Sequence, residues 1–447
     1  MNKRDFLQAA RFDTWQLRAI RHFKGPMLVL AGPGSGKTTV LTNRIRVLTE
    51  ERGIPEENIL VITFTRLAAQ EMKSRYLRLT GRKESTIAFG TFHSVFYSIL
   101  RKDPWYREFE VAGRGECLRL LYDVIFETYG KNALQITMAD DYLDTFGKIK
   151  NGMEVRDEAA LALFPLFSER MRERKLLDYD DMLSLCRKKL LEEESLRKEL
   201  RDRFRFLLID EFQDINKTQY ETVKLITGPE QNIFAVGDDD QSIYGFRGSS
   251  PAFMREFFRD FPRAKKVELS RNYRSTASIV AVSRELIRNN RDRFRKDLRT
   301  KNREGLRPLI ASFPTEKEEA LYIDRTLREL KAAAEKTGYG KLSAACLSRT
   351  HEALTRITEL LPEDTRSFLT AATFHASKGL EFDVVFIVSA NEGITPEKRA
   401  EREGNTEEER RAFYVAMTRA KKFLHILYTE TYYNKKSKVS RFVKEIM

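Results

Sequence analysis

The feature that most constrains this chain is the run at residues 27–39, Met-Leu-Val-Leu-Ala-Gly-Pro-Gly-Ser-Gly-Lys-Thr-Thr. Its first five residues are apolar and predict a buried strand, and residues 40–48 have helical periodicity. Gly32, Gly34 and Gly36 let backbone N–H groups curl around phosphate oxygens at the amino end of a helix, where the helix dipole favours anions. The flanking strand and helix favour this phosphate site over a glycine-rich turn that happens to precede Lys and Thr.

The side chains after the glycines complete a predicted nucleoside triphosphate site. Lys37 can reach the outer phosphates, and the Thr38 hydroxyl can take a coordination position of Mg²⁺. Ser35 and Thr39 are the remaining polar side chains of the predicted loop. Ala31 stands where the usual pattern begins with glycine, a change that leaves the phosphate cradle intact.

An acidic pair later in the chain supplies the predicted catalytic groups. Asp210 and Glu211 follow the apolar run 206–209 and are therefore expected at the carboxyl end of a parallel strand, where ligands of α/β proteins bind. We expect Asp210 to hold Mg²⁺ and Glu211 to orient and deprotonate the attacking water. The alternative is an acidic strand end that only caps the next helix.

Short apolar runs alternate with longer charged segments of helical periodicity, such as residues 67–79 and 276–289. The predicted strands are Met27–Ala31, Ile59–Thr63, Phe206–Ile209, Ile233–Val236, Lys266–Leu269, Ala344–Ser348 and Val384–Val388. This alternation predicts an α/β fold with parallel sheets flanked by helices. Residues 104–175 have helical spacing without a convincing strand and predict a helical insertion, and the charged segment 397–411 predicts a solvated loop running into a helix.

Composition limits the compartment and the partners. The 447 residues include 80 Lys and Arg against 66 Asp and Glu, and the formal net charge of +14 favours a polyanionic partner such as nucleic acid. The three cysteines lie far apart, so we expect neither a disulfide framework nor a zinc module. We find no signal peptide and no apolar run of membrane-spanning length, and we expect a cytoplasmic protein with no membrane partner.

Further motifs carry a resemblance to a known family. They are Thr-Phe-Thr at 63–65, Thr-Phe-His-Ser at 91–94, Asp-Glu-Phe-Gln-Asp at 210–214, Gly-Asp-Asp-Asp-Gln-Ser-Ile-Tyr-Gly-Phe-Arg-Gly at 237–248, Asn-Tyr-Arg-Ser at 272–275, Thr-Phe-His-Ala-Ser-Lys-Gly-Leu-Glu-Phe at 373–382 and Tyr-Val-Ala-Met-Thr-Arg-Ala at 414–420. In this order they resemble the motifs of the UvrD/Rep/PcrA-like superfamily 1A DNA helicases. The resemblance implies two RecA-like P-loop motor domains that hold ATP between them.

The resemblance also implies contacts to the base and sugar of ATP. Tyr273 matches the aromatic residue that stacks on adenine, and Gln16 matches the side chain that reads the edge of the base. Glu381 matches a residue that contacts the nucleotide sugar.

Three more residues match groups that act on the γ-phosphate. Gln241 matches the γ-phosphate sensor, a role that suits an amide because it can bond both water and phosphate. Arg274 and Arg419 match the two arginine fingers, and a guanidinium group is always charged and forks onto phosphate oxygens. Taken singly, each arginine would more often form a surface ion pair.

The same resemblance implies a track for a single nucleic-acid strand, held by aromatic stacking and phosphate contacts. Phe64 and His93 match strand contacts of the first motor domain, and Tyr244 and Phe246 match an aromatic pair beside Arg247. Phe246 stands where many relatives have Trp, which gives a smaller stacking surface. The alternative for Phe64 and Phe246 is ordinary core packing.

Motif spacing predicts the domain boundaries. We expect the first motor domain at residues 1–103 and 176–270, a helical accessory domain at 104–175 and the second motor domain at 271–447. Relatives with a second accessory domain carry a long insertion where this chain has only residues 276–372, so we expect that domain to be absent. The sequence also ends soon after the last motif, and we expect no carboxyl-terminal extension.

The predicted function is an ATP-dependent 3′–5′ translocase or helicase that acts on single-stranded DNA and on junctions with duplex. The polarity comes from the family alone. Alternatives are a nucleotide-dependent DNA-binding switch, an RNA-directed motor, and a motor subunit of a larger repair or defence complex that does not unwind alone. In the last case a protein partner would supply the missing accessory surface.

Overall fold

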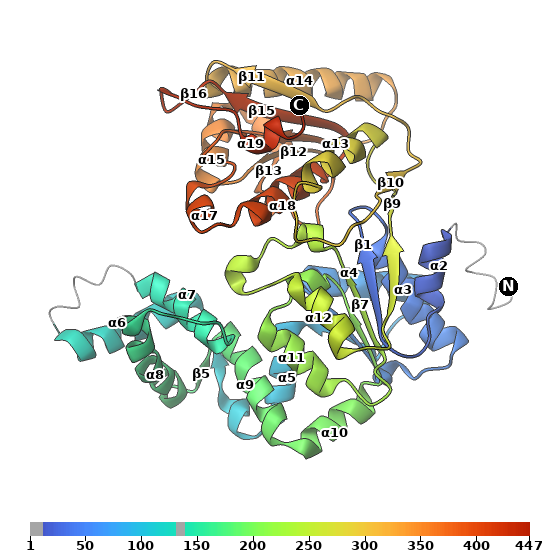
Figure 1. Ribbon diagram of the computed structural model, residues 1–447, viewed down its shortest axis with the longest axis vertical. Coiled ribbons are helices and arrows are strands. Elements are labelled where there is room, and N and C mark those ends of the chain that lie inside the picture. The colour runs from blue at the N-terminus through green and yellow to red at the C-terminus, as the bar shows by residue number, and fades with distance from the viewer. Residues whose placement is uncertain (1–11, 131–138) are drawn as a thin grey trace. The chain divides into compact units, whose positions relative to one another are not determined.

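The computed structural model describes residues 12–130 and 139–447 of the chain (Figure 1). Its described residues form two compact units. The first unit comprises the described residues up to Val29, Lys37–Gly237 and Tyr244–Val267, and the second comprises Leu30–Gly36, Asp238–Ile243 and Glu268–Met447. Among the described residues, no helix is both long and apolar enough to cross a membrane.

The first unit is built on a six-stranded sheet with strand order β3-β2-β6-β7-β1-β8. The strands are β1 (Met27–Ala31), β2 (Ile59–Thr63), β3 (Ala88–Thr91), β6 (Phe206–Ile209), β7 (Ile233–Gly237) and β8 (Lys265–Leu269). The pairs β2–β3, β2–β6 and β6–β7 are parallel. Every residue of β1, β2, β6 and β7 is buried, which explains why these strands read as unbroken apolar runs.

Helices flank this sheet in two packed groups. They are α2 (Thr14–Arg21), α3 (Lys37–Arg46), α4 (Arg66–Thr80), α5 (Phe92–Leu100), α9 (Tyr179–Glu192), α10 (Glu194–Arg203), α11 (Lys217–Ile226) and α12 (Ala252–Asp260). Helix α3 packs against α2 and α4, and α9 packs against α5 and α11. Local sequence sets the ends: Thr65 caps the amino end of α4, and Gly81 ends it in the left-handed conformation at φ +67°.

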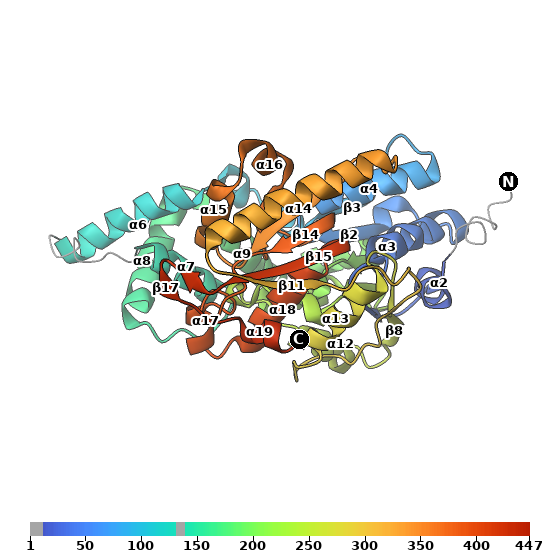
Figure 2. The ribbon, with the colours of Figure 1, turned by 90° about the horizontal axis from the view of Figure 1, so that it is seen from above.

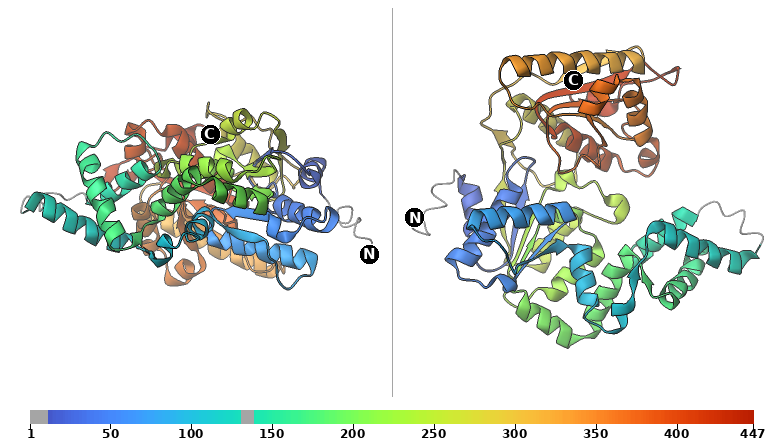
Figure 3. Two further views of the ribbon diagram at one scale, coloured as in Figure 1. Left: turned by 90° about the horizontal axis from the view of Figure 1, so that it is seen from below. Right: turned by 180° about the vertical axis from the view of Figure 1, so that it is seen from behind.

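A helical insertion, coloured teal in Figures 1 and 3, interrupts the first unit. It contains α6 (Arg114–Tyr129), α7 (Ala139–Lys150) and α8 (Glu158–Glu173), which share their own apolar core. The prediction that residues 104–175 contain no strand was wrong at β4 (Glu110–Val111), which pairs in parallel with β5 (Leu176–Leu177). A strand of two residues is too short to show the alternation of apolar and polar side chains that predicts a strand.

The second unit contains a five-stranded parallel sheet with strand order β11-β15-β14-β12-β13. Its strands are β11 (Leu309–Phe313), β12 (Ala344–Ser348), β13 (Thr370–Thr373), β14 (Phe382–Ile387) and β15 (Ala420–Thr429). The helices are α13 (Ala277–Ile287), α14 (Glu316–Lys336), α15 (His351–Leu360), α16 (Glu363–Phe368), α17 (Lys398–Arg402), α18 (Thr406–Met417) and α19 (Arg441–Lys444). Short strands β9 (Arg271–Asn272) with β10 (Arg299–Thr300), and β16 (Thr431–Tyr432) with β17 (Lys435–Lys436), form two small ladders. Figure 2 shows α14 lying along β11 and β15, which it contacts.

These two sheets confirm the predicted α/β fold class, and each predicted strand occurs within two residues of its expected bounds. The prediction for residues 397–411 was partly wrong. Instead of a solvated loop, this segment contains α17 and the first half of α18, in which Glu409, Arg410 and Arg411 are buried. Arg349 explains part of the burial, because it bonds the Glu409 carboxylate at 2.8 Å and the Glu397 carboxylate at 2.9 Å.

Glu319 on α14 gives the second unit a pH-dependent stability. Its side chain is fully buried, and one carboxyl oxygen accepts a hydrogen bond from the Ser389 backbone N–H at 3.0 Å. Burial raises the pKa of Glu319 to about 8. As the pH rises from the ordinary carboxyl pKa towards 8, the unfolded chain therefore releases a proton that the folded chain keeps, and stability falls.

We predict that Glu319→Gln raises the melting temperature of the second unit, because Gln keeps the acceptor for Ser389 without a charge. The gain in the free energy of unfolding should be on the order of a few kcal/mol at pH 8, since one pKa unit corresponds to about 1.4 kcal/mol. This gain should shrink steadily as the pH falls towards about 4.5. Thermal melts of both proteins across this range measure it. A gain that is independent of pH would contradict the assignment.

Candidate functional site

The predicted phosphate loop has the backbone that its glycines require. Gly34 and Gly36 adopt φ +65° and +85°, and α3 begins at Lys37 directly after them. A Cβ at Gly34 would lie 2.7 Å from the Cβ of Arg274, so this position has room only for glycine. The Gly34 carbonyl accepts a bond from the Tyr273 N–H at 2.9 Å, which fixes the loop within the second unit.

The charged centre of the first unit is an ion pair between Lys37 and Glu211. Lys37 Nζ lies 3.0 Å from Glu211 Oε2, and both side chains are mostly buried. Glu211 adopts φ +50°, an uncommon conformation for a residue other than glycine, and it is the second residue after β6. The Gln213 side-chain amide donates to the same carboxylate oxygen at 2.5 Å.

Gln213 is a site residue that the sequence reasoning did not single out. Its side chain is fully buried beside Gly237, where a Cβ would lie 2.8 Å from Gln213 Oε1. The available signal was its place two residues after Glu211.

Asp210 directly follows β6 and is a buried carboxyl group. It is 6% exposed, and burial together with the neighbouring Glu211 charge raises its pKa to about 7. A buried carboxylate of this kind gains from a divalent cation, and oxygen ligands are those that Mg²⁺ prefers. The donor chemistry therefore fits the predicted magnesium role of Asp210, and Thr38 lies in the first turn of α3.

In the second unit, Arg419 holds Gln241. Arg419 is 2% exposed, and its guanidinium donates to Gln241 Oε1 at 3.1 Å and to the backbone oxygen of Val415 at 2.9 Å. The Gln241 amide nitrogen donates to Asp238 at 2.6 Å. Two of the three residues that sequence resemblance assigned to the γ-phosphate, Gln241 and Arg419, are thus in direct contact.

Arg274 and Glu381, predicted as an arginine finger and a sugar contact, also meet in the second unit. Arg274 Nε donates to Glu381 Oε2 at 2.7 Å, and Lys421 lies 2.7 Å from the other carboxylate oxygen. Burial alone would raise the pKa of Glu381, but Lys421 and Arg274 together lower it. Tyr273 is 38% exposed, and the Arg271 guanidinium lies 4.7 Å from its ring centre.

Gln16 has a local structural role in addition to its predicted one. Its side-chain oxygen accepts from the Asp13 N–H at 3.1 Å in a capping box that begins α2. The predicted nucleotide residues divide between the units. Gln16, Lys37, Thr38, Thr39, Asp210 and Glu211 lie in the first, and Gly32, Gly34, Ser35, Gly36, Gln241, Tyr273, Arg274, Glu381 and Arg419 in the second.

Four of the five predicted strand-contact residues form one aromatic and cationic group in the first unit. The Phe64 and Tyr244 rings stack with centroids 5.1 Å apart, and Phe246 lies 6.1 Å from Tyr244. The Arg247 guanidinium lies 5.6 Å from the Tyr244 ring and 5.4 Å from the Phe246 ring. Phe246 is 59% exposed, so core packing does not explain it.

The fifth residue, His93, lies edge-on to Tyr179, with ring centroids 5.6 Å apart. Burial lowers the pKa of His93, and the Arg247 charge lowers it further. Tyr179 is 53% exposed, and sequence reasoning did not single it out. Its signal was an aromatic residue at the point where the chain returns from the helical insertion.

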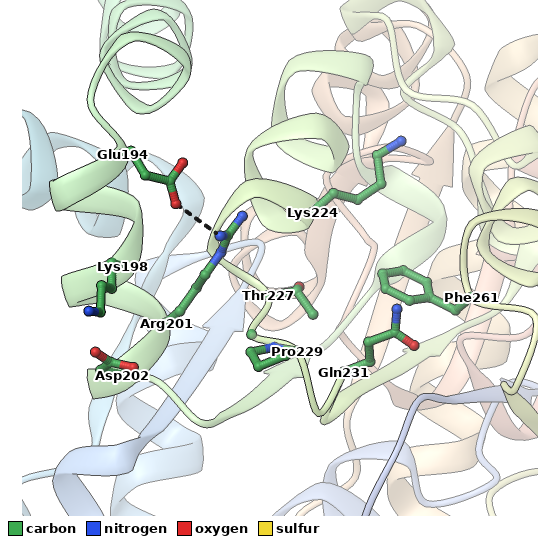
Figure 4. Close-up of a pocket in the computed structure, with 10 residues that line it drawn as sticks. Glu194, Lys198, Arg201, Asp202, Lys224, Thr227, Pro229, Gln231 and Phe261 are labelled. Carbon is green, nitrogen blue, oxygen red and sulfur yellow. Dashed lines mark hydrogen bonds and ion pairs between the residues drawn. The ribbon is translucent and has the colours of Figure 1, made fainter.

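A separate pocket of about 490 Å³ lies elsewhere in the first unit (Figure 4). Its lining includes Arg201 and Lys224 as well as Glu194 and Asp202, so both signs of charge are present. The wall residues Thr227, Gly228, Pro229 and Gln231 precede β7, which places the pocket at the amino ends of the strands, whereas Glu211 follows a carboxyl end. The pocket therefore does not belong to the candidate site.

Comparisons with known proteins agree with this geometry. Residues 12–262 match the UvrD/REP helicase N-terminal domain, and residues 267–370 and 362–431 match the UvrD-like helicase C-terminal domain. The protein YjcD of Bacillus subtilis (strain 168) is 39% identical over 337 residues, which cover 71% of this chain and 44% of that protein.

Two further relatives are named ATP-dependent DNA helicase PcrA. The protein from Staphylococcus epidermidis (strain ATCC 12228 / FDA PCI 1200) is 32% identical over 337 residues, covering 72% of this chain and 46% of the relative. The protein from Staphylococcus aureus (strain COL) is 32% identical over 331 residues, which cover 70% of this chain and 45% of the relative. This chain spans less than half the length of the curated relatives it matches. With both domain matches in sequence order, the chain belongs to the UvrD/REP helicase family and has two RecA-like domains.

Proposed function

We propose that this protein is an ATP-dependent motor that moves 3′ to 5′ along single-stranded DNA and unwinds junctions with duplex. The observation that carries the proposal is the Lys37–Glu211 pair beside a glycine loop with positive φ angles. A phosphate-binding lysine, here at the start of α3, and a carboxylate base, here after β6, are the two groups that hydrolysis of a nucleoside triphosphate requires. The polarity follows the family rather than a contact in this chain.

In the proposed reaction Lys37 binds the outer phosphates of ATP, and Glu211 orients and deprotonates the attacking water. Thr38 and Asp210 would hold Mg²⁺, which would neutralise phosphate charge. When Lys37 turns from Glu211 to the phosphates, the carboxylate loses its paired cation, and this loss favours proton acceptance. Gln241, Arg274 and Arg419 are proposed to stabilise the charge that develops on the γ-phosphate.

Base and sugar contacts complete the proposed ATP site. Tyr273 stacks on adenine, Gln16 reads its edge, and Glu381 contacts the sugar. The nucleic-acid strand is proposed to stack on Phe64, Tyr244 and Phe246, with Arg247 and His93 at its backbone. The net charge of +14 supports a polyanionic partner.

The proposed domains are the first motor domain at 1–103 and 176–270, the helical accessory domain at 104–175 and the second motor domain at 271–447. Residues 276–372 are used by elements from α13 to β13, several of which build the second sheet. This supports the absence of a second accessory insertion there. A motor subunit that needs a protein partner for unwinding is therefore the second candidate.

Steady-state ATP hydrolysis tests the proposal directly. We expect turnover with Mg²⁺ to rise strongly with single-stranded DNA, and less with duplex DNA or single-stranded RNA. Lys37→Ala should abolish turnover because the phosphates lose their cation. Lys24→Ala should not change turnover, since Lys24 is exposed and its ion pair with Glu230 is exposed as well. Normal turnover by Lys37→Ala would remove the phosphate loop from the reaction.

Arg419→Ala should lower turnover by about 10³-fold while ATP binding is kept, as for other arginine fingers. Arg419→Lys should also be impaired, because a single ammonium cannot bond Gln241, Val415 and a phosphate in the same geometry. Turnover and ATP affinity are measured together with melting temperature. An unchanged rate would place Arg419 outside the reaction.

Phe246→Ala should weaken binding of single-stranded DNA by about 1–3 kcal/mol, the usual worth of one stacked base. Phe246→Trp should strengthen it, because the indole ring is larger. Phe126, on α6, is similarly exposed at 61% and provides a matched control. Equal effects of Phe246→Ala and Phe126→Ala in a fluorescence anisotropy titration would contradict the proposed track.

A further inference from the structure

Three consecutive aspartates of the second unit surround one lysine. Asp238, Asp239 and Asp240 are each no more than 1% exposed, and Lys296 Nζ makes ion pairs with all three carboxylates, the one to Asp240 at 3.0 Å. Arg293 adds a two-bond contact to Asp240 at 2.6 and 2.7 Å. The three carboxylates lie close enough to hold a metal ion, but the Lys296 ammonium bonds all of them.

The charge balance makes Lys296 essential to this cluster. Three buried carboxylates would repel one another strongly without compensation, because buried charge is costly unless paired. Burial alone would lower the pKa of Lys296, but the three carboxylates raise it well above its ordinary value. With Lys296 and Arg293 charged, the five groups carry a net charge of −1.

The cluster is connected to Gln241 through Asp238. One Asp238 oxygen pairs with Lys296, and the other accepts the Gln241 side-chain amide at 2.6 Å. The other end of that amide accepts from Arg419 at 3.1 Å. The Gln241 side chain is thus fixed at both ends, by Asp238 and by Arg419.

Two more cations hold the backbone at and after Gln241. Lys378 donates to the Gln241 carbonyl at 2.8 Å, and Arg411 donates to the Ser242 carbonyl at 3.0 Å. The contact that runs from Lys296 through Asp238 differs from these two, because it ends on the Gln241 side-chain amide that the proposed reaction uses.

We propose that Lys296 is a positioning residue for ATP hydrolysis: by fixing the Asp238 carboxylate, it aims the side-chain amide of Gln241. The proposal rests on the proposed function, since Gln241 matters here as the γ-phosphate sensor. Lys296 itself touches neither nucleotide nor water in this role. Its removal should therefore slow the chemical step and leave ATP affinity intact.

The decisive variant is the double substitution Lys296→Met with Asp239→Asn. This double variant keeps the net charge of the cluster at −1, so it adds no uncompensated buried charge. Asp238 stays in place but loses its cation. We expect kcat at saturating ATP and single-stranded DNA to fall about 10- to 100-fold, as for other residues that orient a reacting group, with unchanged ATP affinity. The single variant Lys296→Arg keeps a cation at this position, so its kcat should fall less.

Lys150→Met is the matched control. Lys150 is a similarly buried lysine, 4% exposed, between Asp178 at 2.6 Å and Asp181 at 2.8 Å in the first unit. It should melt at a lower temperature and leave the hydrogen exchange of peptide 238–243 unchanged. Hydrogen exchange of the peptide 238–243 gives a second readout that needs no turnover, and only the Lys296 variants should exchange faster there.

The outcomes separate the two proposals. If the double variant keeps both kcat and the protection of peptide 238–243, Lys296 only stabilises the fold and the inference is wrong. If the wild-type protein hydrolyses no ATP, the proposed function fails, while hydrogen exchange still decides whether Lys296 holds this segment.

Discussion

Parallel strands that are buried on both faces can present polar groups only where they end, and this constraint organises the first unit. Strands β1, β2, β6 and β7 contain no exposed residue. The charges that follow β6 therefore gather at one edge with those that open α3, and Lys37 meets Glu211 there. The same burial raises the pKa of Asp210. This edge therefore brings together a lysine and two carboxyl groups, which are groups suited to binding a phosphate and a cation.

Ion pairing balances the charges at this edge. Lys37 and Glu211 neutralise one another in a mostly buried place, which avoids an isolated buried charge. Phosphate can replace the carboxylate as the partner of Lys37 because both are anions of similar hydrogen-bonding capacity. The second unit also balances buried charge by ion pairing, since a single lysine, Lys296, pairs with three carboxylates.

The sequence predicted the parts of the fold whose signals are local. Apolar strands such as Ile59–Thr63 are read directly, and the glycine loop requires positive φ angles that few other residues adopt. Strands β11 and β13 escaped prediction because they are sheet edges, partly exposed and weakly apolar. Contacts between distant segments were also out of reach: nothing in the residues around Lys296 signals a partner more than fifty positions earlier.

The helical insertion shows how such distant contacts tie the candidate site together. Asn151, directly after α7, donates to Asp180 at 2.7 Å and accepts from the Asn216 side chain at 2.9 Å. Asn216 in turn caps α11 and bridges to Ser249, next to the segment that carries Arg247. Asn151 and Asn216 are both buried and bonded, so a shift of the insertion has to break several hydrogen bonds. The insertion therefore belongs to the framework that positions Arg247 and Tyr179, and a change in its packing should be felt at the proposed nucleic-acid track before it is felt at Lys37.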